Sequence, residues 1–276
     1  MHSSLATLAL LSGASAAFEL PNPFGAPRAQ LSARFVAMKA TPTVGVADVL
    51  QSPRWPETWP YTAKDLGRQD ESDDNMFYSQ PRFCYHVDEK AVAALTAYYA
   101  AEFPKVGSQP AVLDLCASHV SHFPADVADY TGRRVALGMN EEELRENRQV
   151  DEYVVRDLNV DPTLPFPDDS FDIVTNAVSI DYLTKPLEIC KEVARVLRPG
   201  GTAMFALSNR CFPTKAIGLW LQTNDLEHVF IVGSYFHYSN GFQKPTAVEV
   251  GPNPSWAGGQ SMNNAYLSVV RATVDK

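Results

Sequence analysis

The sequence has little of what would identify a disulfide framework, a metal site or a membrane span. Its four cysteines, among 276 residues, form no CxxC pair and stand far apart, at Cys84, Cys116, Cys190 and Cys211. That spacing excludes the common zinc motifs and predicts buried, reduced thiols, and no metal site is predicted elsewhere. No apolar run reaches the roughly 18 residues that a membrane span needs. These absences favour an ordinary globular domain.

Basic residues are also scarce. The chain has 23 lysines and arginines against 32 acidic residues, a net charge of −9. Residues 1–40 hold three of the basic residues and one acid, so the remainder carries 20 against 31, a net of −11. A surface of that charge repels phosphate backbones, and nucleic acid is therefore not expected as a partner.

Residues 1–40 differ in composition from the rest. A short apolar stretch, SSLATLALLSGASAA (3–17), ends in small residues as secretory signals do, and the segment after it is basic with Glu19 as its one acid. The order resembles the bipartite presequence of algae with secondary plastids, in which an aromatic residue, here Phe18, follows the signal. We expect removal of 1–40 and a plastid location. The alternative is a secreted protein of the endoplasmic reticulum route.

Residues 41–85 are predicted to form an irregular N-terminal arm packed on the domain. Prolines interrupt the segment, and tryptophan, tyrosine and phenylalanine side chains provide anchors for it. Its acidic stretch QDESDD (69–74) lacks a defensible metal-ligand spacing, so a solvated acidic loop is expected in place of a metal loop.

Residues 86–276 alternate between apolar strand patterns and amphipathic helix patterns. A helix is predicted to start after Asp88, and further helices over 124–130, 140–148 and 186–197. Strands are predicted over 111–115, 133–138, 152–156, 171–178 and 201–208, with two closing strands within 246–251 and 265–274. This alternation predicts a doubly wound α/β sheet whose ligand lies beyond the carboxyl ends of the strands.

The first strand leads into a loop that is short of glycine. AVLDL (111–115) delivers Asp114 to the expected ligand edge, where nucleotide-binding folds usually place glycine at alternate positions. Here Cys116, Ser118 and Val120 occupy those positions. Glycine permits positive φ and a close backbone approach, whereas a β-branched valine permits neither.

Two motifs together resemble class I S-adenosylmethionine-dependent methyltransferases of the type 11 kind. They are YVVRDLNVDPTLPFPDDSFDIV (153–174) and LEICKEVARVLRPGG (187–201), and the resemblance covers roughly residues 86–250. The loop at 112–124 and LGMNEEEL (137–144) are similar to a plant, algal and cyanobacterial branch that shares the missing glycines. The resemblance implies a Rossmann-like sheet of seven strands with an antiparallel final strand, and S-adenosylmethionine as cofactor.

The resemblance also implies a set of cofactor-binding residues. Asp114, Cys116 and Ser118 stand in the first loop, while Asp157 and the Leu158 backbone stand where the family reads the adenine amino group.

In the family, an acidic residue at the end of the second strand holds the ribose of the cofactor, and this chain lacks that acid. Gly138 stands at its position, and Asn140 is the expected substitute. On this basis Gly138→Asp is expected to strengthen cofactor binding.

Candidates for contact with the methyl acceptor follow the fourth and fifth strands. Asp181 and Tyr182 are expected to face the site from the fourth strand, and Asn209 from the fifth, although Asp181 and Asn209 are equally suited to capping and turn bonds. His119 and His122 could replace lost contacts or act as an acid and base, or be satisfied by local backbone. No catalytic residue is predicted, because methyl transfer needs chiefly alignment of donor and acceptor.

Two functions remain open from the sequence. The first is methyl transfer from S-adenosylmethionine to an unidentified small molecule. The second is a methyltransferase-fold protein that binds a ligand or partner protein without catalysis. The altered loop favours the second, while the retained Asp157 favours the first. Neither the acceptor nor the oligomeric state is predicted.

Overall fold

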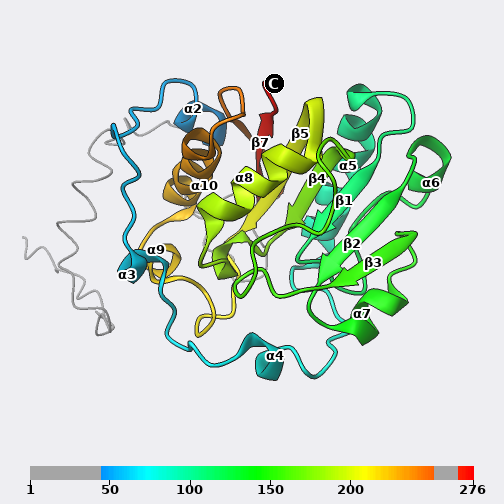
Figure 1. Ribbon diagram of the computed structural model, residues 1–276, viewed down its shortest axis with the longest axis horizontal. Coiled ribbons are helices and arrows are strands. Elements are labelled where there is room, and N and C mark those ends of the chain that lie inside the picture. Colours follow the sequence, from blue (N-terminus) through cyan, green and yellow to red (C-terminus); the bar gives the residue numbers. More distant parts are fainter. Residues whose placement is uncertain (1–44, 252–266) are drawn as a thin grey trace, which may run out of the picture.

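The computed structural model describes residues 45–251 and 267–276, which contain one seven-stranded sheet (Figure 1). The strands run in the order β3-β2-β1-β4-β5-β7-β6. Their bounds are β1 Val112–Leu115, β2 Arg134–Gly138, β3 Glu152–Val155, β4 Phe171–Ala177, β5 Leu197–Ser208, β6 Thr246–Glu249 and β7 Leu267–Thr273. The first five are parallel, and β7 is antiparallel to both β5 and β6. The predicted α/β class and antiparallel final strand are confirmed.

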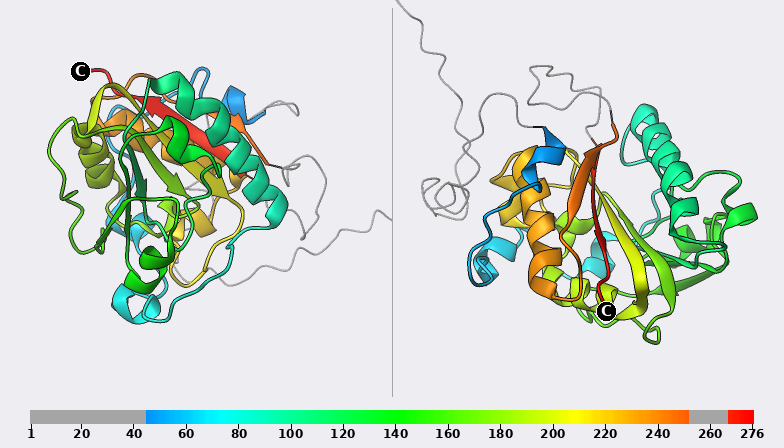
Figure 2. Two further views of the ribbon diagram at one scale, coloured as in Figure 1. Left: turned by 90° about the vertical axis from the view of Figure 1, so that its right-hand side faces the viewer. Right: turned by 90° about the horizontal axis from the view of Figure 1, so that it is seen from above.

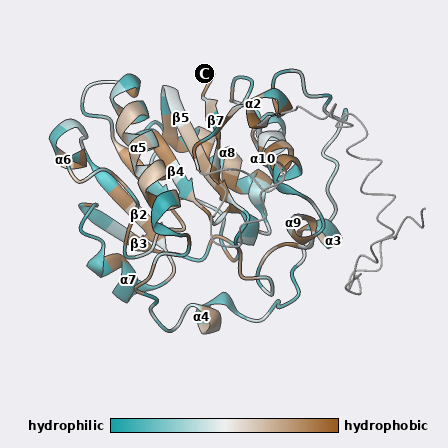
Figure 3. Cartoon of the chain, turned by 180° about the vertical axis from the view of Figure 1, so that it is seen from behind, coloured by the Kyte–Doolittle hydropathy of each residue, from teal (hydrophilic) through white to brown (hydrophobic). Residues whose placement is uncertain are grey.

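Helices cover both faces of the sheet, which Figure 2 shows edge-on in its right-hand view. One face packs against α8 (Pro186–Val196) and α10 (Asp225–Ser239), and the other against α5 (Glu89–Val106). Shorter helices complete the domain: α6 Val127–Tyr130, α7 Glu141–Glu146, α9 Gly218–Leu221 and the 3₁₀ turn η2 Ile180–Tyr182. Apolar residues gather on the strands in Figure 3, as expected of strands buried on both faces.

Two of the four predicted helix starts are confirmed by their caps, whereas the helix predicted over 124–130 begins only at Val127. The Asp88 carboxylate accepts a hydrogen bond from the Ala91 N–H at the start of α5, and the Asn140 side chain accepts one from Glu143 at the start of α7. Each bond satisfies a backbone donor that has no partner within the helix.

The boundary between α8 and β5 differs from the prediction. The sequence predicted a helix over 186–197 and a strand from 201, but β5 already begins at Leu197, which pairs with Phe171. The next pair is Ile173 with Thr202, so the segment between them forms a bulge. Gly200 adopts a φ of 78° there, which glycine tolerates without strain.

Residues 45–85, the described part of the predicted arm, contain three one-turn helices: α2 Val46–Val49, α3 Ala63–Leu66 and α4 Asp74–Phe77. Trp55 packs against Phe230 and stacks on His237 of α10. From there the chain passes along the carboxyl ends of the strands before it enters α5 (Figure 1). The predicted presequence, 1–40, lies outside the described residues.

None of the described helices is long and apolar enough to cross a membrane. The described residues contain no group of three or more histidine, cysteine or acidic side chains arranged to hold a metal ion. All four cysteines are free thiols. Cys190 is buried as expected, but Cys116 and Cys211 are partly exposed, and Cys84, on the irregular arm, is exposed, so the expectation of burial is wrong for these three.

Candidate functional site

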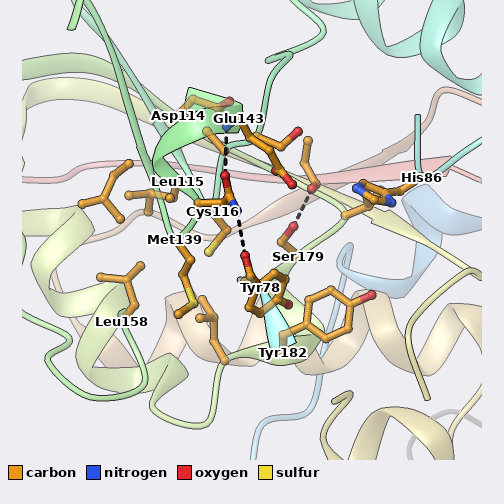
Figure 4. A pocket seen from close by; sticks show the side chains of 18 of the residues that line it. Tyr78, His86, Asp114, Leu115, Cys116, Met139, Glu143, Leu158, Ser179 and Tyr182 are labelled. Carbon is orange, nitrogen blue, oxygen red and sulfur yellow. Dashed lines mark hydrogen bonds between the residues drawn. The ribbon is translucent and has the colours of Figure 1, made fainter. Parts of the chain in front are cut away.

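A cavity lies at the carboxyl edge of the sheet, where the loops after the parallel strands meet the arm (Figure 4). Side chains from the ends of β1, β2, β3, β4 and β5 contribute to its wall, as do residues of the arm. The wall includes Tyr78, Arg82, His86, Asp114, Cys116, Ser118, Gly138, Asn140, Glu143, Asp157, Leu158, Tyr182, Arg210 and Phe212. This is the edge at which the alternation of strands and helices predicted a ligand.

The loop after β1 keeps the backbone shape of a glycine-rich loop at its first position. Cys116 has a φ of 55°, in the left-handed region that glycine favours. Before it, Asp114 is buried and accepts a hydrogen bond of 2.7 Å from the Thr175 hydroxyl. Burial raises the pKa of Asp114 to about 7, although hydrogen bonds from Thr175 and Ser121 act in the opposite direction. Ser118, the third predicted member of the loop, also lines the cavity.

Gly138 is required by a close backbone approach. The Ala117 N–H donates a hydrogen bond to the Leu137 carbonyl, which draws the loop after β1 against the end of β2. A Cβ on Gly138 would overlap the Ala117 carbonyl oxygen. The expectation that Gly138→Asp strengthens cofactor binding is therefore wrong, because the added side chain would displace the loop that forms the cavity wall.

Asn140 lies beside the cavity but is engaged by its neighbours. Its side-chain oxygen accepts the Glu143 N–H at 3.0 Å, and its amide donates to the Tyr78 carbonyl at 2.8 Å (dashed in Figure 4). It therefore joins the start of α7 to the arm. Glu143 comes from the same helix, lines the cavity and accepts the backbone N–H of Arg82.

Asp157 and Leu158 form the wall beyond β3. One oxygen of Asp157, Oδ1, accepts the N–H groups of Asn159 and Val160 and shapes a tight loop. Its other oxygen has no hydrogen-bond partner in the described part of the chain. Leu158 is buried and supplies apolar surface. The pairing of a carboxylate oxygen with an apolar wall suits a ring that carries an amino group.

The three residues predicted to contact the methyl acceptor differ in whether they line the cavity. Tyr182 lines the cavity, and its hydroxyl accepts the Phe212 N–H at 3.0 Å. Asp181 does not line the cavity, contrary to the expectation: successive side chains of the 3₁₀ turn η2 point about 120° apart, and that of Asp181 turns into the core. Asn209 is exposed outside the wall, where Arg210 stands instead.

The prediction for residues 69–74 is wrong at Asp74. Its side chain is only 3% exposed and forms ion pairs with Arg68 at 2.7 Å and with Lys215 at 3.0 Å. Lys215 is fully buried, and its ammonium also donates to the Ser72 carbonyl. Asn159, next to the Asp157 loop, donates to Asp74 at 3.0 Å. Burial alone would raise the pKa of Asp74, but hydrogen bonds from Arg68, Asn159 and Lys215 lower it.

The two histidines of the first loop differ in position. His122 is buried and lines the cavity, and no hydrogen-bond partner of its Nδ1 lies within the described part of the chain. Burial, with smaller effects of His119 and His86, lowers the pKa of His122 to about 4. His119 lies outside the wall, 3.5 Å from the Ser118 hydroxyl. Local backbone therefore does not satisfy the Nδ1 of His122.

The contribution of the arm to the cavity wall is not among the features predicted from the sequence. Tyr78 and Arg82 come from the segment expected to be irregular, and both line the cavity. The aromatic and basic residues of FYSQPRF (77–83) were the available signal, but their position depends on contacts with Asn140 and Glu143. Val178 also lines the cavity, with a φ of 47° that a β-branched residue seldom adopts.

Comparison with known proteins gives a family match for a segment that carries much of this site. Residues 111–205 match the sequence model of a family described as a methyltransferase domain. The malonyl-[acyl-carrier protein] O-methyltransferase of Marinomonas sp. (strain MWYL1) is 32% identical over 66 residues, which are 24% of this chain and 24% of that protein. The chain thus matches about a quarter of the length of this curated relative.

Solved structures share the fold. A chain of the Haloferax volcanii complex between the Trm112 methyltransferase activator and a methyltransferase has a TM-score of 0.50 and 19% identity, with 68% of this chain and 91% of that chain covered. The [4+2]-cyclase SpnF has a TM-score of 0.50 and 14% identity, with 73% and 91% covered. The segment 111–205, which carries the loop after β1 and the Asp157 loop, is thus similar to the type 11 family of methyltransferase domains.

Proposed function

We propose that the chain transfers a methyl group from S-adenosylmethionine to a small-molecule acceptor. The observation that carries the proposal is the cavity at the carboxyl edge, in which the loop after β1 and the Asp157 loop face one space. The first loop keeps its glycine-like turn at Cys116, and Gly138 lets it approach β2. The residues present therefore fit the cofactor.

Each part of the wall has a role in this proposal. Asp157 would accept the adenine amino group through its unpartnered oxygen, with Leu158 against the ring. The loop at 114–118 would enclose the methionine end. Bound S-adenosylmethionine supplies an electrophilic methyl group on its sulfonium sulfur. The chain's own task is then to exclude water and align the acceptor's nucleophile with that group, which can contribute several kcal/mol without a covalent step.

Calorimetric titration with S-adenosylhomocysteine tests the proposal. Asp157→Asn keeps Oδ1 for the Asn159 and Val160 N–H groups but replaces the free oxygen by an amide that cannot accept. We expect affinity to fall about tenfold or more with unchanged thermal stability. The control is Asp161→Asn, since Asp161 lies in the same loop but not in the cavity wall. A wild-type chain that binds neither S-adenosylmethionine nor S-adenosylhomocysteine at millimolar concentration would contradict the proposal and favour a non-catalytic binding protein.

We also propose that residues 1–40 direct the protein to a plastid. The support is their composition alone, an apolar stretch followed by a basic, acid-poor segment. A fusion of residues 1–40 to a fluorescent protein should accumulate in the plastid of an alga with secondary plastids. Secretion of the fusion would support the alternative route.

A further inference from the structure

Arg82 lacks the carboxylate partner that most described arginines of this acidic protein have. Nine described arginines form ion pairs with carboxylates: Arg68, Arg133, Arg134, Arg145, Arg148, Arg156, Arg195, Arg198 and Arg271. No described carboxylate lies within ion-pair distance of the Arg82 guanidinium, although that side chain is half-buried and lines the cavity. A half-buried cation without a counter-ion indicates a site that an anion completes.

The guanidinium of Arg82 is held in place before any ligand arrives. It lies over the Phe77 ring, 4.6 Å from the centroid, and 5.6 Å from that of Phe212. One of its nitrogens donates to the Phe77 carbonyl at 2.8 Å, while its backbone N–H donates to Glu143 at 2.6 Å. Since these contacts use one N–H of the head group and its faces, other N–H donors remain for a planar anion.

The carboxylates near Arg82 are engaged elsewhere. Asp74 is neutralised by Arg68 and Lys215, and Glu143 accepts the backbone N–H of Arg82. Arg210 adds a second cation to the same wall, from the segment after β5. The wall between these arginines is aromatic, with Tyr78, Tyr182 and Phe212.

We propose that the methyl acceptor is a small molecule with a carboxylate, which binds to Arg82 with help from Arg210 while its apolar part packs against the aromatic wall. The proposal rests on the proposed function, since it names the class of acceptor for the same cavity. It adds a specificity-determining residue that lies outside the segment matched to the family, on the arm.

The test is a pair of probes of equal shape and different charge, benzoate and benzamide. Each is titrated calorimetrically into the full chain saturated with S-adenosylhomocysteine. We expect benzoate to bind at least tenfold tighter than benzamide. Arg82→Gln should remove that preference, and Arg82→Lys should retain part of it because the charge remains. Arg148→Gln, a change at an exposed arginine outside the cavity, should leave the preference intact.

Two results would overturn the proposal. One is the absence of a benzoate preference in the loaded wild-type chain. The other is a preference that survives Arg82→Gln in a variant whose thermal unfolding matches that of the wild type. If Arg82→Gln does not fold, the proposal is still tested by the benzoate preference of the wild type and by its partial retention in Arg82→Lys.

A second pair of ligands separates this proposal from the proposed function. S-Adenosylhomocysteine carries a carboxylate, and 5′-methylthioadenosine does not. If Arg82→Gln weakens only the former, the guanidinium binds the cofactor's own carboxylate; the acceptor proposal then falls and the proposed function stands. If the Arg82→Gln variant binds each ligand as tightly as the wild type does, the result supports the assignment of Arg82 to the acceptor. Failure of wild type to bind either ligand removes the proposed function and this proposal with it.

Discussion

Cys116 carries a side chain in a backbone conformation that usually belongs to glycine. Its φ of 55° places it in the left-handed region, where a Cβ crowds the neighbouring carbonyl oxygen. Burial raises the pKa of its thiol to about 12, so the group is a poor nucleophile at neutral pH. The residue therefore forms the wall of the site by its shape, at a cost in strain.

Replacing Cys116 by glycine should relieve that strain. We expect Cys116→Gly to raise the free energy of unfolding by roughly 0.5 kcal/mol and to tighten binding of S-adenosylhomocysteine. Urea denaturation and calorimetry measure the two effects. Cys116→Ala is the matched control, because it removes the thiol but keeps the Cβ. An equal gain in the alanine variant would assign the effect to the thiol and contradict the strain argument.

At Gly138 the constraint is not the backbone conformation but the lack of space for a Cβ atom. Gly138→Ala should lower the free energy of unfolding by about 2 kcal/mol or more, because its Cβ meets the Ala117 carbonyl oxygen. We also expect loss of S-adenosylhomocysteine binding, since the loop after β1 must move. Gly45→Ala is the control, as its Cβ would make only an ordinary contact. Unchanged stability of Gly138→Ala would disprove this close approach.

At the scale of elements, the arm is attached to the domain by a buried charge network of Arg68, Asp74 and Lys215. Asp74 lies at the start of α4, and Lys215 lies between β5 and α9. Asn159 connects the network to the loop of Asp157. The wall formed by the arm is thus coupled to the proposed adenine contact through one carboxylate.

Asp74→Asn tests this attachment. It leaves two buried cations with reduced compensation, so we expect a loss of about 3 kcal/mol or more in the free energy of unfolding. Glu71→Gln, at an exposed partner of Arg68, should cost less than about 1 kcal/mol. Chemical denaturation of both variants measures the difference. Similar small losses in both would show that the buried pairs contribute no more than surface ones.

The elements that could be predicted from the sequence are those whose signals are local. The periodic apolar residues of 89–103 and the cap at Asn140 act within a few neighbours, so their helices were predictable. Asp74 was not, because its burial depends on Lys215, far along the chain. The role of Gly138 likewise depends on a carbonyl of another loop, and no pattern around residue 138 reveals it.

At the scale of the whole molecule, buried carboxyl groups connect stability to pH. Burial raises the pKa of Asp181 to about 8, against about 3.9 in an unfolded chain. The folded state therefore holds the proton more tightly. The stability from this proton is complete below pH 4 and is lost as pH rises through about 8.

We expect the wild-type free energy of unfolding to fall between pH 6.5 and 8, by at most about 1.4 kcal/mol per pH unit for one group. Asp181→Asn should show a shallower decline. Asp129→Asn, at an exposed carboxylate, should follow the wild type. Urea denaturation across this range measures all three. A wild-type stability that is flat or rising over the window would contradict the raised pKa.

The attachment of the arm also bears on the order in which the protein is completed during synthesis. Ser72 and Lys215 are separated by 143 residues, so the arm leaves the ribosome well before its partner exists. At 5–20 residues per second, that interval is on the order of ten seconds. During it, β1 to β4 can already pair, while the arm lacks its ion pairs with the buried Lys215. The attachment of the arm is therefore completed only after those strands are made. A chain truncated before Lys215 would have the strand that carries Asp114 and the loop that carries Asp157, but an incompletely attached arm.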